Sequence, residues 1–116
     1  MQYLLMCCIN EASWDALPAT ERDDVMRDYG ELIRDLAQQG RYVAGAKLRS
    51  TATATTVRQR NGRPVLTDGP FAETKEQLGG YYLIEAKDLN DAIQVAGKIP
   101  AAKTGSVEVR PIEVFG

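Results

Sequence analysis

The stretch Asp68–Glu85, DGPFAETKEQLGGYYLIE, decides how this chain folds because it joins two halves of a scaffold. It opens on an Asp-Gly-Pro turn, passes through alternating charges and a Gly-Gly pair, and ends in an apolar strand. That strand, expected over 80–86, shows no clean alternation of polar and apolar residues, so both of its faces should be covered. The apolar run Tyr3–Ile9 predicts a second central strand of the same kind.

A long amphipathic helix is expected between the first strand and the next one. Thr20 is its predicted N-cap, with Asp23 in the capping-box position, and Gly40 is expected just past its end. Gly30 interrupts the helix, where glycine costs about 1 kcal/mol relative to alanine. We expect either close packing of Gly30 against the sheet or a ligand that approaches the backbone beside Tyr29.

One further strand and a β-hairpin are expected before the central stretch. Residues 41–49 form the strand, with one face made of Tyr42, Ala44, Ala46 and Leu48. The pair Asn61-Gly62 between two strand-like runs predicts a hairpin closed by a type I′ turn. The hairpin is polar and carries three arginines, so it should project from the main sheet as a soluble edge or, alternatively, attract an anion.

The second half predicts a short helix followed by a last strand. Asp88 is the expected N-cap, Pro100 should end the helix, residues 101–105 should form a loop, and residues 106–114 a strand. The order is therefore βαββαβ with an inserted β-hairpin, which is an α+β, ferredoxin-like fold in a single domain, 1–116. Helices would cover one sheet face, and a second copy would cover the other, which predicts a homodimer with facing sheets.

Composition limits the chemistry available to the chain. It has 116 residues, no histidine, two cysteines and a formal net charge of −2, with a pI near 5.1. A histidine-ligated metal and a cysteine-only zinc site are excluded, and acid–base work near pH 7 would need a perturbed carboxylate, Lys, Tyr or Cys. Neither a metal nor a cofactor is predicted, and the acidic balance argues against nucleic acid as a partner.

The two cysteines and the N-terminal run bear on the compartment. Cys7 and Cys8 are adjacent, which favours small buried residues in a reducing environment over a reactive thiol. The run 1–10 has neither a basic start nor a small-residue cleavage site, and no stretch is long and apolar enough to span a membrane. A cytoplasmic protein is therefore expected.

The segment 68–76, DGPFAETKE, followed by Gly79-Gly80-Tyr81, resembles the signature of the YCII-related family, in its DGPF branch. The segments ATATTVR (52–58), IPAA (99–102) and GSVEVRP (105–111) agree with the same family, so the resemblance covers nearly the whole chain. It implies a dimeric α+β barrel and a link to sigma-factor-dependent transcriptional signalling. The His–Asp pair proposed as a catalytic centre in other members has no counterpart here, because the chain lacks histidine.

The acidic candidates for catalysis lie in the central stretch. Asp68 is either an Asx-turn residue or a general base in a cleft, and Glu73 is either part of a solvated, self-paired charge run or an acid–base partner of Lys75. Gly79-Gly80 allows either a close ligand approach or a β-bulge.

The binding candidates are spread over several segments. Phe71 is expected to anchor the loop, and Arg110 is expected to hold an anion or to pair with a nearby acidic residue. Tyr81 and Tyr82 should point to opposite faces, one toward the helices and one toward the dimer cleft. The full predicted set for ligand binding is Tyr29, Arg49, Phe71, Lys75, Tyr81, Tyr82 and Arg110.

Three functions fit the sequence. The first is a cofactor-independent enzyme acting on a small, anionic or aromatic molecule through carboxylates. The second is a ligand-binding accessory protein without turnover, and the third is a protein-interaction module that uses the arginine hairpin and the DGPF loop. The second is favoured, because few residues are suited to chemistry at pH 7.

Overall fold

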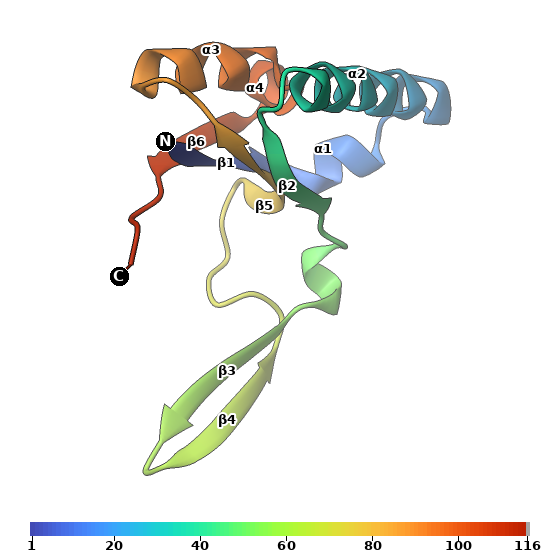
Figure 1. Cartoon of the computed structure of the whole chain (residues 1–116). Helices are drawn as coiled ribbons and strands as arrows, with labels where there is room; N and C mark the ends of the chain where they lie inside the picture. Colours follow the sequence, from blue (N-terminus) through green and yellow to red (C-terminus); the bar gives the residue numbers. More distant parts are fainter. Residues whose placement is uncertain (116) are drawn as a thin grey trace.

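The computed structural model describes residues 1–115 and has two sheets and four α-helices (Figure 1). The strands are β1 (Gln2–Ile9), β2 (Tyr42–Lys47), β3 (Thr55–Arg60), β4 (Arg63–Asp68), β5 (Gln77–Glu85) and β6 (Ser106–Pro111). The helices are α1 (Glu11–Asp15), α2 (Ala19–Gln38), α3 (Leu89–Lys98) and α4 (Ala101–Thr104), with a 3₁₀ turn at Thr51–Thr53.

The main sheet has the strand order β2-β5-β1-β6, and all neighbouring strands are antiparallel. Helices α2, α3 and α4 lie together on one face of it (Figure 1). This is the predicted ferredoxin-like βαββαβ arrangement, and the fold class is confirmed.

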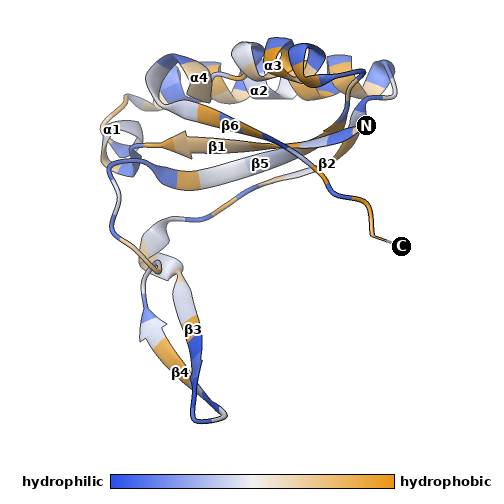
Figure 2. Cartoon of the chain, turned by 90° about the vertical axis from the view of Figure 1, so that its left-hand side faces the viewer, coloured by the Kyte–Doolittle hydropathy of each residue, from blue (hydrophilic) through white to orange (hydrophobic). Residues whose placement is uncertain are grey.

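Strands β3 and β4 form a separate two-stranded sheet, which we call the hairpin arm (residues 55–68). Figures 1 and 2 show that it projects away from the helix layer, on the side of the open sheet face. Asn61 and Gly62 have φ values of 53° and 75°, so the predicted type I′ turn is confirmed.

The core lies between the helices and the inner face of the sheet. Alternate residues of β1 and β5 point into it, including Leu5 and Ile84, which are fully buried. On the outer face Leu4, Met6 and Leu83 are only half-buried. Within a single chain the outer face is therefore left open, because α2, α3 and α4 all pack on the inner side. The expectation that a second copy covers the outer face stays a prediction.

The boundaries of α2 differ from the sequence expectation at one end only. Thr20 is not the N-cap, because Pro18 occupies that position and its carbonyl oxygen accepts hydrogen bonds from the amides of Glu21 and Arg22. At the other end Gly40 has φ +70°, and the Arg41 amide donates to the Leu36 carbonyl oxygen. This Schellman-type ending confirms the predicted role of Gly40.

Two short helices, α1 and α4, lie outside the helices expected from the sequence. α1 follows Asn10, whose side chain accepts from the Ser13 amide. α3 begins at the predicted cap, because the Asp88 carboxylate accepts from the Asp91 amide at 2.9 Å. Pro100 ends α3 and then serves as the N-cap position of α4, so the expected loop over 101–105 is wrong.

A bulge in β2 reverses the predicted face of Tyr42. The register moves from Tyr42 opposite Ile84 to Ala44 opposite Leu83, so these two residues point to opposite faces. Tyr42 thereby faces the helices, and the single face predicted for Tyr42, Ala44, Ala46 and Leu48 does not exist. β6 also ends at Pro111, earlier than the predicted 114.

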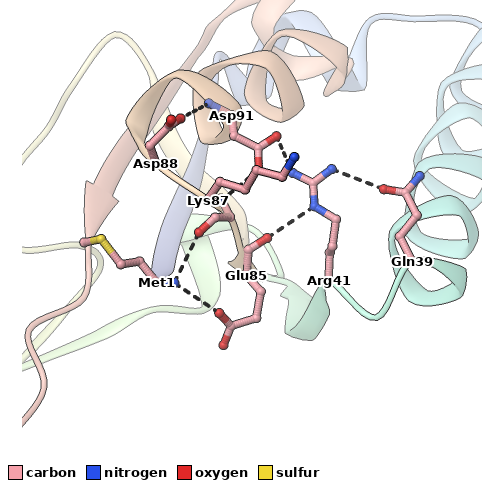
Figure 3. A network of polar contacts seen from close by, with 8 residues as sticks. Met1, Gln39, Arg41, Glu85, Lys87, Asp88 and Asp91 are labelled. Carbon is pink, nitrogen blue, oxygen red and sulfur yellow. Dashed lines mark hydrogen bonds and ion pairs between the residues drawn. The ribbon is translucent and has the colours of Figure 1, made fainter.

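Arg41 joins the end of α2, the start of β2 and the first turn of α3 (Figure 3). Its guanidinium donates to Asp91 Oδ1 at 2.8 Å, to Gln39 Oε1 at 3.1 Å and to the Glu85 carbonyl oxygen at 3.3 Å. Asp91 also accepts from the Lys87 amide at 2.9 Å. These contacts fix α2 and α3 relative to β5.

Candidate functional site

A cavity of about 480 Å³ lies between α2 and the inner face of the main sheet. Val25, Tyr29 and Gly30 of α2 form one wall, and Cys7 and Tyr82 of the sheet form the other. Residues of α1 and α4 complete its lining. The volume lies in the range typical of small-molecule sites, and most of the lining is apolar.

Two glycines lie on opposite walls of the cavity. Gly80 lies in one row with Lys47 and Cys7 on neighbouring strands. A Cβ atom on Gly80 would come within 2.8 Å of the Ala46 carbonyl oxygen. Gly30 lies on the opposite wall, and a Cβ there would meet nothing within 4 Å. Close packing therefore does not explain Gly30. The alternative, a ligand that approaches the backbone beside Tyr29, stays a prediction.

Gly79 has a different role from Gly80. Cys7 pairs with Gly80 and Cys8 pairs with Leu78, so Gly79 is the extra residue of a β-bulge. Neither glycine has a positive φ among the described residues. Gly79 therefore forms the bulge, and Gly80 forms part of the cavity wall.

Four tyrosines line the cavity, and the rings of three of them lie close together. We call these three, Tyr29, Tyr42 and Tyr82, the tyrosine cluster. The ring centroids of Tyr29 and Tyr82 are 6.2 Å apart, and those of Tyr42 and Tyr82 are 6.3 Å apart. Both distances suit favourable aromatic pairs. The Tyr29 hydroxyl accepts a hydrogen bond from the Ala101 amide at 3.2 Å, which ties α2 to α4.

Tyr82 also lines the cavity. Within residues 1–115 its hydroxyl makes no hydrogen bond, whereas every side-chain oxygen that is fully shielded from solvent in this part of the chain has a partner. The Tyr82 hydroxyl is therefore not fully shielded from solvent, although the residue as a whole is buried. It provides a hydrogen-bonding group for a bound molecule.

Three titratable groups of the cavity wall, the Cys7 thiol and the hydroxyls of Tyr29 and Tyr82, are kept neutral by burial. Burial raises the pKa of Cys7 to about 11 and that of Tyr29 to about 12. Burial also raises the pKa of Tyr82, and its neighbours Cys7, Tyr29 and Tyr42 add to the effect. At pH 7 these groups are protonated and act as hydrogen-bond donors and acceptors rather than as bases.

Two further lining residues, Lys47 and Trp14, form a cation–π contact. The Lys47 ammonium lies 5.2 Å from the centroid of the Trp14 ring and 3.9 Å from Met26 Sδ. A second cavity of about 410 Å³ adjoins the first and shares Lys47 and Trp14 with it. The predicted residue Arg49 lines this second cavity.

The predicted catalytic residues lie outside both cavities. Asp68 ends β4 and Glu73 follows in the loop, and both are exposed. Among the described residues, the Asp68 carboxylate accepts no hydrogen bond, so the Asx-turn is not formed. Glu73 forms no ion pair with Lys75 or with any other residue of the described chain.

The predicted binding residues divide into two groups. Tyr29, Tyr81 and Tyr82 border the main cavity, with Tyr82 on the helix side and Tyr81 on the outer side of β5. Lys75 is exposed. Arg110 forms an ion pair with Glu108 at the surface, which is the expected alternative of pairing with a nearby acidic residue. Phe71 is 81% exposed, so its expected role as an anchor within the chain is wrong.

Sequence reasoning missed Cys7, Trp14, Tyr42 and Lys47 as cavity residues. A signal existed at Gly45, where a Cβ would lie 2.9 Å from the Tyr82 ring and 2.7 Å from the Tyr42 hydroxyl oxygen. The small residues of β2 therefore marked the place where the tyrosine cluster packs. Among residues 1–115 no group of three His, Cys, Asp or Glu side chains is arranged to hold a metal ion. In the same part of the chain, no helix has the length and apolarity to cross a membrane.

Comparisons with known proteins agree with this architecture. The chain is 38% identical over 117 residues to an uncharacterised protein of Rhizobium meliloti (strain 1021), covering 99% of this chain and 94% of that protein. Its fold is similar to that of the 5-chloro-2-hydroxyhydroquinone dehydrochlorinase from Burkholderia phenoliruptrix AC1100, solved in complex with 2,5-dihydroxybenzoquinone. The TM-score is 0.56 at 14% identity, over 97% of this chain and 94% of the other. The model of the YCII-related domain matches residues 1–116, and the chain therefore belongs to the YCII-related family.

Proposed function

We propose that this protein binds a small planar molecule in the cavity between α2 and the main sheet. The observation that carries the proposal is an apolar cavity of about 480 Å³ whose polar groups include the hydroxyls of the tyrosine cluster. Aromatic walls favour a flat ring by stacking and edge contacts. The dehydrochlorinase of the same fold binds 2,5-dihydroxybenzoquinone, a molecule of this size and shape.

Binding without turnover is the better supported form of this function. The raised pKa values of Cys7, Tyr29 and Tyr82 keep these groups protonated at pH 7, so none of them serves as a general base. The carboxylates predicted for acid–base work, Asp68 and Glu73, lie on an exposed segment away from the cavity. A carboxylate-based enzyme that uses Asp68 or Glu73 would need a ligand outside this cavity.

Trp14 allows a direct test, because it is the only tryptophan and it lines the cavity. Titration with cinnamamide, a neutral planar probe, should give a saturable change in Trp14 emission and a higher melting temperature. Gly30→Leu should weaken binding by filling the cavity. Gly97→Leu, the control, places the same side chain in α3 at a site that is also open, away from the cavity.

Two variants in the central stretch, 68–85, test whether the probe binds in the cavity or in that stretch. Asp68→Asn and Glu73→Gln should bind cinnamamide as the wild type does. Wild-type affinity in Gly30→Leu would contradict the cavity as the site. Loss of binding in the two loop variants would place the site in the segment that the sequence singled out.

We also propose a homodimer in which a second copy covers the outer face of the main sheet. This face carries the half-buried side chains of Leu4, Met6, Tyr81 and Leu83. The hairpin arm projects on the same side and exposes Val57 and Leu66 (Figures 1 and 2). The arm would therefore flank the second copy, which gives its apolar side chains a partner.

A further inference from the structure

We infer that the ligand of the cavity carries a negative charge and that Lys47 is the residue that recognises it. The inference rests on the proposed function and adds the chemical class of the ligand: a planar aromatic carboxylate or an acidic phenol. Its anionic group would lie beside the Lys47 ammonium, and its ring beside the tyrosine cluster.

Lys47 is placed for this role by the register of the sheet. It is the last residue of β2 and pairs with Gly80, which pairs in turn with Cys7 on β1. Gly80 has no side chain between Lys47 and Cys7 in this row, and all three residues line the cavity. Lys47 lies on the same face as Gly45 and Tyr82, so its side chain starts from the cavity side of the sheet.

The Lys47 ammonium has no carboxylate partner. Within residues 1–115 no acidic oxygen lies within 4 Å of it. Its neighbours are the Trp14 ring and the Met26 sulfur, both of which are weak partners for a cation. An anionic ligand would replace these weak contacts with a charge-assisted hydrogen bond.

The other charges around the cavity leave Lys47 available. The cavity is lined by two lysines, Lys47 and Lys103, and by one acidic residue, Asp28. In the adjoining cavity Glu11 is already engaged, because its carboxylate accepts from both the amide and the hydroxyl of Thr51. The remaining charges there are Arg49 and Asp15, which have opposite signs. The lining of the main cavity therefore favours an anion over a cation.

Cinnamate and cinnamamide provide a matched pair of probes, since they have the same planar skeleton and differ in charge. Affinities are measured by isothermal titration calorimetry at low salt, with Trp14 emission as a second readout. The wild type should bind cinnamate about tenfold more tightly than cinnamamide, as expected for one charge-assisted hydrogen bond. The preference should weaken as salt is added.

Lys47→Met should remove the preference for cinnamate and leave the affinity for cinnamamide within about twofold of wild type. Lys98→Met, a control in α3 outside the cavity, should keep the full preference. Equal binding of the two probes by wild type would overturn the inference while the proposed function stands. A preference retained in Lys47→Met and lost in Lys103→Met would also overturn it. No binding of either probe would overturn the proposed function and the inference together.

Discussion

Gly105 shows how strongly a single backbone position can constrain this fold. It follows α4 and lies against β1, so that a Cβ there would come 2.2 Å from the Cys8 carbonyl oxygen. That oxygen belongs to the backbone of a central strand and cannot move without disturbing the sheet. We expect Gly105→Ala to lower the free energy of unfolding by about 2–3 kcal/mol, measured by urea denaturation.

Gly97→Ala is the matched control for this substitution. Gly97 lies in α3, and its Cβ would meet nothing within 4 Å. Alanine there should raise the free energy of unfolding by about 0.5–1 kcal/mol, because it reduces the entropy of the unfolded chain and favours the helix. Equal stability of the two variants would contradict the close approach of Gly105 to β1.

Asp91 should make stability depend on pH in the acid range. The hydrogen bond from the Lys87 amide is the main cause that lowers the pKa of Asp91, and the Arg41 guanidinium adds to it against the opposing effect of burial (Figure 3). Because the folded-state pKa is lowered, the stabilisation is present above the unfolded value of about 3.9 and is lost as pH falls through the folded value.

Asp91→Asn should therefore have a lower melting temperature than wild type at pH 7. This difference in melting temperature should become smaller as the pH falls below about 4. Melting curves recorded between pH 2.5 and 7 measure this. Asp35→Asn, at an exposed position of α2 without an ion pair among the described residues, should follow the wild-type profile. Parallel profiles for Asp91→Asn and wild type would exclude the Asp91 contacts as a source of the pH dependence.

The sequence identified some cavity residues and not others, for a physical reason. Tyr29 and Tyr82 follow from periodicity, since each lies in a regular helix or strand whose inner face can be read from the pattern. Tyr42 does not, because a bulge in β2 changes its face and no periodic pattern contains a bulge. Asp68 and Glu73 were predicted as catalytic candidates from their residue type. Residue type alone does not determine whether a loop side chain lines a cavity.

At the level of elements, the sequence predicted what has strong local signals. The hairpin turn, the cap at Asp88 and the end of α2 at Gly40 all depend on one or two residues with a defined geometry. The helices α1 and α4 have five and four residues, too few to show a helical period. They matter for function nonetheless, because both line the cavity.

The hairpin arm should be dispensable for folding of the main sheet. Its strands pair only with each other, and every residue of β4 is exposed. Thr56 and Thr67 are directly paired across the arm. If residues 57–60 and 63–66 are deleted, the Asn61-Gly62 turn connects Thr56 directly to Thr67 and closes a shorter hairpin. The shortened protein should keep a cooperative melting transition and the wild-type affinity for cinnamamide. Loss of the transition would show that the arm supports the core.

At the scale of the whole molecule, the proposed homodimer can be tested at the outer sheet face. Facing sheets would bury Leu83 of the central strand β5 against a second copy, and the two-fold symmetry of such a dimer repeats every change in both subunits. Leu83→Lys would place two charges in the interface. Because burying these ammonium groups in the interface costs several kcal/mol of desolvation free energy, we expect dimer affinity to fall by roughly a thousandfold or more. Sedimentation equilibrium at micromolar concentration measures this.

Ile93→Lys separates an effect on the interface from a general effect of charge. Ile93 lies on α3 in the helix layer, across the sheet from the outer face, and is about half exposed, so lysine there should leave both folding and association unchanged. The cavity lies on the helix side of the sheet, so monomeric Leu83→Lys should still bind cinnamamide. A wild-type protein that sediments as a monomer would refute the dimer without touching the binding proposal. Loss of ligand binding on dissociation would instead mean that the second copy helps to form the site.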